Sequence, residues 1–223
     1  AVSVIVLNNE TYAYVDANAD VHAGGNVLIS AVDTSDLDVI AGAVGIGLGT
    51  AGVGASVGVT VINKDTQAWI GENAEVDAKG SSSALIVFDG TLDSSGNFGV
   101  TDGTDDARGV SVTALSSEDY FAVAAAGSLG EYAGVSGAIT VEVVDSDTSA
   151  WIAGGALINT DTVGANANQD VHVAAANDFT SLVIDGSIGG SLGGGIAGGV
   201  DVGIVRNDTS AWIAGSDVRA EAA

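Results

Sequence analysis

The chain has 223 residues, of which 47% are hydrophobic, and its five Lys plus Arg against 29 Asp plus Glu give a formal net charge of -24. This hydrophobic fraction excludes a disordered acidic tail, and the charge disfavours nucleic acid as a partner while favouring cations. The absence of cysteine excludes disulfides and thiolate metal sites. No apolar run reaches the roughly 18 residues of a transmembrane helix, so no direct membrane insertion is expected.

One six-residue element recurs four times and aligns the rest of the chain. It occupies residues 10–15, 65–70, 147–152 and 208–213 and contains all three tryptophans. Ahead of each copy, aliphatic residues alternate with small or polar ones. This alternation is typical of a strand with one buried face, and we expect the aliphatic residues on that face.

Tyr14, Trp69, Trp151 and Trp212 occupy the same position in the four copies. The residues that would share their face of the strand are mostly polar, which predicts that the aromatic side faces outward. We expect these four aromatics to act in contact and packing. Covering the chain's own turns, lateral packing and a carbohydrate-binding platform all remain open.

Further elements follow each anchor in chain order. A second short strand is predicted at residues 20–23, 75–78, 170–173 and 217–220. A third apolar strand comes next, and then a glycine-rich strand such as residues 42–58. There the aliphatic residues take one face and glycines the other. A strand whose outer face is bare backbone would let a neighbouring chain or a loop of the same chain come close.

Internal repeats of this size predict a solenoid, in which each unit buries its apolar face against its neighbours. Because the units are strands, the expected fold is all-β, a parallel β-helix (β-solenoid). Coils of about 20 residues stacked at about 4.8 Å predict a rod on the order of 50 Å long. Residues 1–223 are expected to form a single solenoid segment of a longer repetitive protein. Polar insertions near 89–109 and 160–170 are expected to project as loops.

The candidate chemistry is limited. Asp102, Asp105 and Asp106 are the best candidates for a hard cation such as calcium, which takes carboxylate and carbonyl oxygens, with a solvated loop as the alternative. No other cofactor is expected. Ser56 lies in a G-x-S-x-G pattern but inside an alternating strand, not on the strand-to-helix turn that a nucleophile needs. The chain is therefore not expected to be an enzyme, and no catalytic residue is assigned.

Two stretches resemble the repeats of very large bacterial surface proteins of the leukotoxin-like filamentous adhesin type. They are GVGASVGVTVINKDTQAWIG (52–71), followed by AEVDA (74–78), and AGGNVLISA (23–31) at the end of the first copy. The resemblance implies an exported, right-handed parallel β-helix rod that builds adhesins or extracellular fibres. It implies an extracellular location, at the cell surface or secreted, and no active site.

The expected function is therefore structural, as a rigid extracellular rod in a bacterial surface filament or adhesin stalk. Copies of the chain or adjoining repeats would associate end to end by continued β-stacking. A cell-surface glycan or neighbouring fibres are further candidate partners. The alternative is a carbohydrate-binding or ice-binding module that uses the outward aromatics.

Overall fold

A computed structural model describes residues 1–93 and 101–220, and every regular element in them is a strand. None of these residues belongs to a helix that could cross a membrane. The strands are β1 (Val2–Val15), β2 (Asp20–Ala23), β3 (Val27–Gly47), β4 (Ala51–Ile70), β5 (Glu75–Ala78), β6 (Leu85–Asp93), β7 (Thr101–Ala107), β8 (Gly109–Gly130), β9 (Ala133–Ile152), β10 (Leu157–Ile158), β11 (Asp170–Ser191), β12 (Gly195–Ile213) and β13 (Asp217–Val218).

The long and short strands form three parallel sheets that the chain visits in a repeating order. Sheet I has the order β1-β4-β9-β12, sheet II the order β13-β10-β5-β2, and sheet III the order β11-β8-β3. Each passage adds one strand to sheet I, then sheet II, then sheet III. The antiparallel pair β6-β7 is inserted between β5 and β8. The fold is thus all-β with parallel sheets, as expected.

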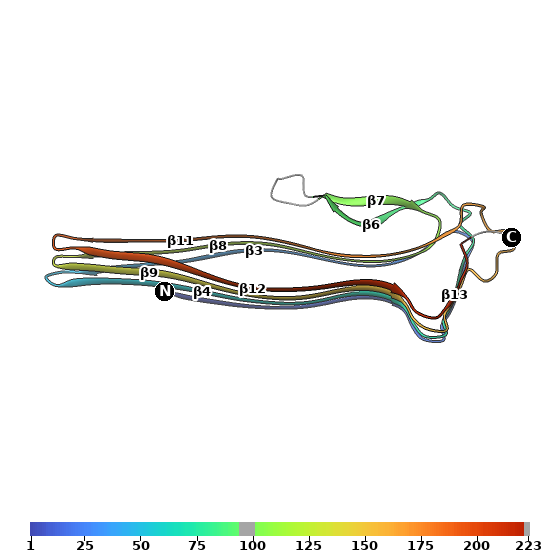
Figure 1. Ribbon diagram of the computed structural model, residues 1–223, viewed down its shortest axis with the longest axis horizontal. Helices are drawn as coiled ribbons and strands as arrows, with labels where there is room; N and C mark the ends of the chain where they lie inside the picture. Colours follow the sequence, from blue (N-terminus) through green and yellow to red (C-terminus); the bar gives the residue numbers. More distant parts are fainter. Residues whose placement is uncertain (94–100, 221–223) are drawn as a thin grey trace.

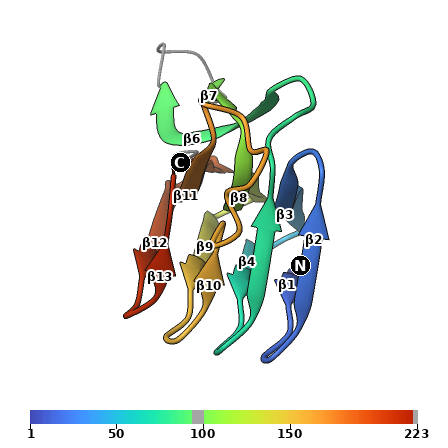
Figure 2. The same ribbon diagram turned by 90° about the vertical axis from the view of Figure 1, so that its right-hand side faces the viewer.

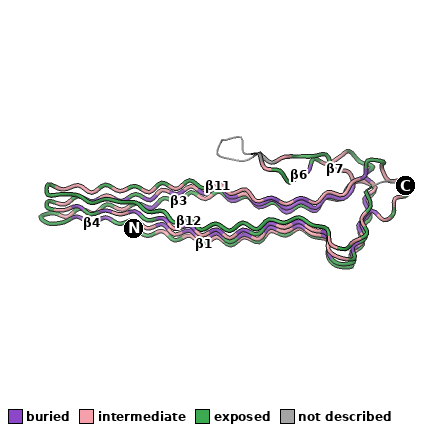
Figure 3. Tube along the Cα trace, viewed as in Figure 1, coloured by how far each residue is buried: buried purple, intermediate pink, exposed green. Residues whose placement is uncertain are grey.

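Sheets I and III face each other as two long layers, and sheet II joins them across one end (Figure 1, Figure 2). The largest apolar cluster lies among the three sheets and includes Ile70, Val76 and Val112, all fully buried. Buried residues line the facing sides of the two long layers (Figure 3). The β6-β7 hairpin lies outside sheet III (Figure 1).

Three corners between sheets I and II depend on left-handed backbone. Asn18 and Asn73 have φ of 59° and 55° at equivalent turns. Asparagine tolerates this region better than other residues with a Cβ, and glycine adopts it freely. Gly155, with φ of 76°, takes this place in the third repeat.

The predicted alignment of the anchors is confirmed. Thr11 pairs with Thr66, Thr66 with Thr148, and Thr148 with Thr209 in neighbouring strands of sheet I. The alignment of the second element is wrong in the third repeat. Residues 170–173 begin β11 in sheet III, and the short strand β10 takes the predicted place in sheet II.

The expected coil of about 20 residues is also wrong. Individual strands run for 14 residues in β1 and 22 in β8, so one passage through the three sheets uses a whole repeat. The glycine-rich stretch 42–58, expected as one strand, contains the end of β3, a turn at residues 48–50 and the start of β4. The long axis of the molecule therefore runs along the strands instead of along the stacking direction (Figure 1).

Over much of sheet I the expectation that the aliphatic residues lie on the buried face is wrong. In β4 the buried side chains include Ser56 and Thr60, whereas Val53 is 68% exposed. The glycines face inward as well, since a Cβ on Gly45 would meet the carbonyl of Val53 and one on Gly54 that of Gly127. The two layers approach so closely here that only small inward residues fit, and the aliphatic residues are left outside. The close approach expected at the glycines is thus made by the opposite sheet of the same chain.

The two polar insertions differ in structure. The first contains β6 and β7, which pair as an antiparallel hairpin, and its residues 94–100 lie outside the described part. The second has no regular strand between Ile158 and Asp170. Backbone hydrogen bonds from Asn166 to Lys79 (2.7 Å) and from Asp170 to Arg108 (2.5 Å) hold it against the rest of the chain.

Candidate functional site

The outer face of sheet I carries a continuous aromatic stack. Trp69 lies parallel to Tyr14 with ring centroids 4.5 Å apart, and the steps from Trp69 to Trp151 and from Trp151 to Trp212 are 5.1 Å each. The interplanar angles are 7°, 5° and 2°. In-register parallel pairing produces the stack, because each anchor aromatic lies opposite its equivalent in the next strand.

A column of carboxylates runs beside this stack on the same face, formed by Glu10, Asp65, Asp147 and Asp208. Tyr12 links the two columns, since its hydroxyl donates to Asp65 Oδ2 at 2.7 Å and its ring lies edge-on to Trp69 at 5.9 Å. The hydrogen bond to the carboxylate raises the pKa of Tyr12 to about 12. The tyrosine is therefore a stable donor over the physiological pH range.

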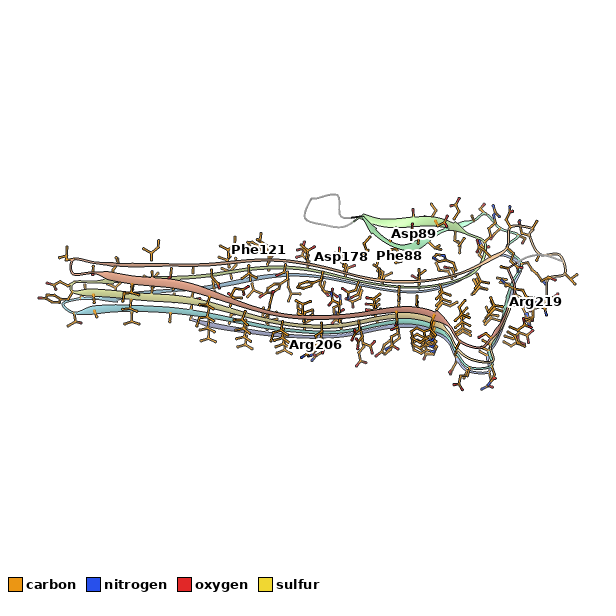
Figure 4. All side chains as sticks on the ribbon, viewed as in Figure 1. Phe88, Asp89, Phe121, Asp178, Arg206 and Arg219 are labelled. Atoms are coloured by element: carbon orange, nitrogen blue, oxygen red, sulfur yellow. The ribbon has the colours of Figure 1, made fainter. Side chains whose placement is uncertain are left out.

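The carboxylate column borders a shallow surface hollow of about 520 Å³. Its other lining residues include Asn8 and Asn63, whose side chains hydrogen bond at 2.7 Å, and Asp145. Asp145 lies 3.7 Å from Arg206 on the outer side of sheet I, where Figure 4 places the arginine. The hollow offers polar and acidic groups but no described nucleophile–base pair.

Removing one aromatic tests how much the stack stabilises sheet I. We expect Trp151→Ala to lower the free energy of unfolding by about 1–3 kcal/mol, because it removes two ring contacts, each worth about 0.5–1.5 kcal/mol beyond burial. Trp212→Ala should lose about half as much, since Trp212 contacts one ring. Urea unfolding of the two variants measures the difference, and equal losses would contradict a contribution from stacking.

The acidic column should also make stability depend on pH. Burial, together with the charges of Asp145, Asp208 and Asp65, raises the pKa of Asp147. Burial raises the pKa of Glu142 and of Asp170. A carboxyl group with a raised pKa in the folded state destabilises the fold when it is ionised, and this penalty is relieved as pH falls through the folded pKa.

We therefore expect the melting temperature at low salt to rise between pH 7 and about pH 5. Below about pH 4 it should fall in protein that has a free Asp33 carboxylate. Burial raises the pKa of this group, but hydrogen bonds from Lys64 and Thr11 lower it overall, and below about pH 4 the group begins to gain a proton. Added NaCl should raise the melting temperature at pH 7 by screening the carboxylates. Circular dichroism melts measure both effects, and a steady fall from pH 7 to pH 5 would refute the like-charge interpretation.

The candidate calcium ligands lie on the β6-β7 hairpin. Asp105 and Asp106 are exposed neighbours on β7, so their side chains leave opposite faces of the strand. Asp105 instead accepts a hydrogen bond from the backbone N–H of Asp106 at 2.8 Å. The side chain of Asp102 lies outside the described residues. The two described carboxylates are not brought together around a common point.

Sequence reasoning missed a different group, His22, Glu75 and Asp77, whose candidate ligand atoms lie within 4.8 Å of one another. His22 contacts Asp20 at 2.7 Å and the buried Asp77 at 3.3 Å. The signal was the pairing of Asp20-Val21-His22 with Glu75-Val76-Asp77 in adjacent strands. An imidazole among carboxylates suits a transition metal better than calcium, and the contacts of His22 with Asp20 and Asp77 account for the same geometry without a metal.

No protein-family model, no curated protein and no solved structure matches this chain.

Proposed function

We propose that the chain is a structural segment of a right-handed β-solenoid, serving as a rod in an extracellular bacterial filament or adhesin stalk. Its function is to carry a continuous stack of β-strands. Further strands, from another copy of the chain or from adjoining repeats, extend the stack at both open sides of sheet I.

The observation that carries this proposal is the register of sheet I. Over the described residues, β1 and β12 each pair on one side only. The columns end in equivalent residues at the two edges, with Val2 aligned through Val57 and Ile139 to Val200, and Tyr14 aligned through the tryptophans to Trp212. An edge strand with unpaired N–H and C=O groups is a template for another strand. The β1 edge therefore matches residues 200–213 of the β12 edge of a second copy in register.

The aromatic stack supports the same join. Tyr14 and Trp212 end the stack and are 56% and 43% exposed. Placing β1 of one copy on β12 of another would set Tyr14 on Trp212, as Tyr14 already lies on Trp69. The join would continue both the hydrogen-bond ladder and the stack.

The outward valines provide a second contact surface. Val2, Val4 and Val6 of β1 are more than half exposed, and equivalent aliphatic residues of β12 continue the same face. Contiguous exposed apolar surface of this kind marks interaction sites. In the proposed filament this face packs against the same face of a neighbouring fibre.

The carbohydrate-binding and ice-binding alternatives have weaker support. Sugars bind to aromatic faces, but each face of Trp69 and of Trp151 is covered by the next ring. An ice-binding surface needs an exposed, regular ladder, whereas Thr66 and Thr148 of the anchor are fully buried.

Electron microscopy of the purified chain, with calcium and with a chelator, tests the proposal. We expect filaments whose axial repeat equals the thickness of one copy along the strand-stacking direction. Loss of filaments in chelator would assign the acidic groups a bridging role. Dispersed single particles in both conditions, at every protein concentration tried, would overturn self-assembly.

A further inference from the structure

A buried charge cluster lies between sheets I and III, away from the outer face described above. The ammonium of Lys64 on β4 lies 2.5 Å from Asp33 Oδ1 on β3 and 2.9 Å from Glu118 Oε1 on β8. It also donates to the carbonyl of Ser117 at 3.1 Å. The side chains of Lys64, Asp33 and Glu118 are 0%, 8% and 1% exposed. An amine and two carboxyl groups are thus held in contact and shielded from water.

The repeats provide an internal comparison, because every position of this cluster has equivalents in neighbouring strands. Uncharged residues occupy all of them: Asn9, Ser146 and Asn207 in the column of Lys64, Ser116 and Asn177 in that of Asp33, and Ser35 and Phe179 in that of Glu118. The fold does not require charge at these places. Three charged residues that the neighbouring strands lack are nevertheless in contact with one another, and this indicates a function for the combination.

The two carboxyl groups are placed differently. Asp33 accepts hydrogen bonds from Thr11 at 2.9 Å and Ser35 at 3.2 Å, in addition to Lys64. Such donors stabilise negative charge that develops on the carboxyl oxygens during attack on Cγ. Glu118 Oε1 accepts from Lys64 and from the hydroxyls of Ser116 at 2.6 Å and Ser146 at 3.1 Å. Its Oε2 is buried and has no hydrogen-bond partner among the described residues. Glu118 therefore has an oxygen available to take up and return a proton.

We propose that Lys64 and Asp33 form an intramolecular isopeptide bond, with Glu118 as the proton carrier. A proton moves from the ammonium to the Asp33 carboxylate across their 2.5 Å contact, which gives a neutral amine and a carboxylic acid. Nζ then attacks Cγ. Glu118 takes a proton from the attacking nitrogen and delivers it to the departing hydroxyl, so that the C–OH bond breaks, one water leaves and Glu118 regains its starting state. The ammonium and the carboxylate together yield the amide and water without any other reactant.

The ionised state of the cluster before reaction limits the rate of bond formation. Burial raises the pKa of Asp33, but hydrogen bonds from Lys64, Thr11 and Ser35 outweigh it and lower the pKa overall, so the ion pair is the starting state. The first proton transfer is therefore uphill, and the bond should form after folding and slowly.

The product would tie sheet I to sheet III in a chain that has no cysteine. It would close the arch in which β3 turns at residues 48–50 into β4. This inference does not depend on the proposed filament, since it concerns a bond within one chain.

Mass spectrometry of the purified, denatured chain tests the proposal. The intact mass should be about 18 Da below the sequence mass, the loss of one water. Lys64 is the first Lys or Arg of the chain and the next is Lys79. Trypsin should therefore fail to release residues 1–64 and should yield residues 1–79 with one water missing. Free 1–64 at its full mass, after prolonged incubation of the folded protein, would overturn the proposal.

Two controls separate the link from other causes. Cyclisation of aspartate before glycine, as at Asp89 and Asp185, also loses water, but residues 1–79 contain no Asp-Gly or Asn-Gly pair. Glu118→Gln keeps the shape of the side chain and removes the proton carrier, so it should give unlinked protein that still shows the wild-type circular dichroism spectrum. Formation of the link at the wild-type rate in Glu118→Gln would overturn the role of Glu118.

Discussion

Lys64→Met should lower the free energy of unfolding by about 3–5 kcal/mol, the usual loss when one member of a buried ion pair is removed. The methionine fills a similar volume, but Asp33 and Glu118 are left buried without a counter-charge. Their side chains are only 8% and 1% exposed, so water cannot compensate for the lost ammonium. Urea unfolding followed by circular dichroism measures the loss. This loss applies to the unlinked chain. The linked chain has no Lys64–Asp33 ion pair to lose, and there the variant loses the constraint that the amide places on the unfolded chain.

The matched control comes from the repeat itself. Lys64→Asn, Asp33→Ser and Glu118→Ser together install residues that occupy equivalent positions in neighbouring strands. Because the triple variant leaves no buried charge without a counter-charge, it should be more stable than Lys64→Met alone. A triple variant that is less stable than the single one would contradict this account of the cluster. Lys64→Met within about 1 kcal/mol of wild type would contradict it as well.

The repeat made the pairing of sheet I predictable. Thr66, Ala68 and Trp69 recur in a fixed order, and residues that repeat in sequence come to lie opposite one another when strands stack in register. The prediction needed no long-range information beyond the repeat. It failed at residues 170–173, because a similar short pattern of alternating residues begins the long strand β11.

The orientation of the faces could not be read from the alternation alone. A period of two identifies two faces, but which face is buried depends on the spacing between the sheets. Near Ile70 the sheets are far enough apart to bury large residues, and the expected orientation of apolar residues inward holds there. Near Gly54 the sheets are too close for a Cβ, so the neighbouring valines lie outside.

The Lys64 cluster was missed for a related reason. Its members lie on three strands of two sheets, and no local motif connects them. The available signal was that each breaks the composition of its own column. In a repetitive chain, the residues that differ from their equivalents in other repeats are therefore the most informative about function. That such residues contact one another can be seen only once the three-dimensional fold is known.

Val205→Pro on β12 should abolish filament formation while leaving the single particle folded. Ala214 donates its N–H to Ile152 of β9, and alternate N–H groups along a strand point to opposite sides, so the N–H of Val205 points to the open edge. Proline there removes no hydrogen bond to β9 but takes away a donor that a following strand would use, and its ring obstructs the approach. Electron microscopy and sedimentation compare the variant with the wild type, and circular dichroism checks the fold.

Val205→Ala is the control, because it trims the same side chain but keeps the N–H group. If the open edge of β12 is the joining surface, Val205→Ala should still form filaments and Val205→Pro should not. A proline at Val6 should have the same effect from the opposite edge, since Val15 of β1 accepts from Gly71 of β4 and residues of the other parity face away from β4. Filaments of normal length from both proline variants would mean that the copies meet through another surface. The outward valine face of sheet I would then be the contact to test, because it is the other extended apolar surface that sheet I presents among the described residues.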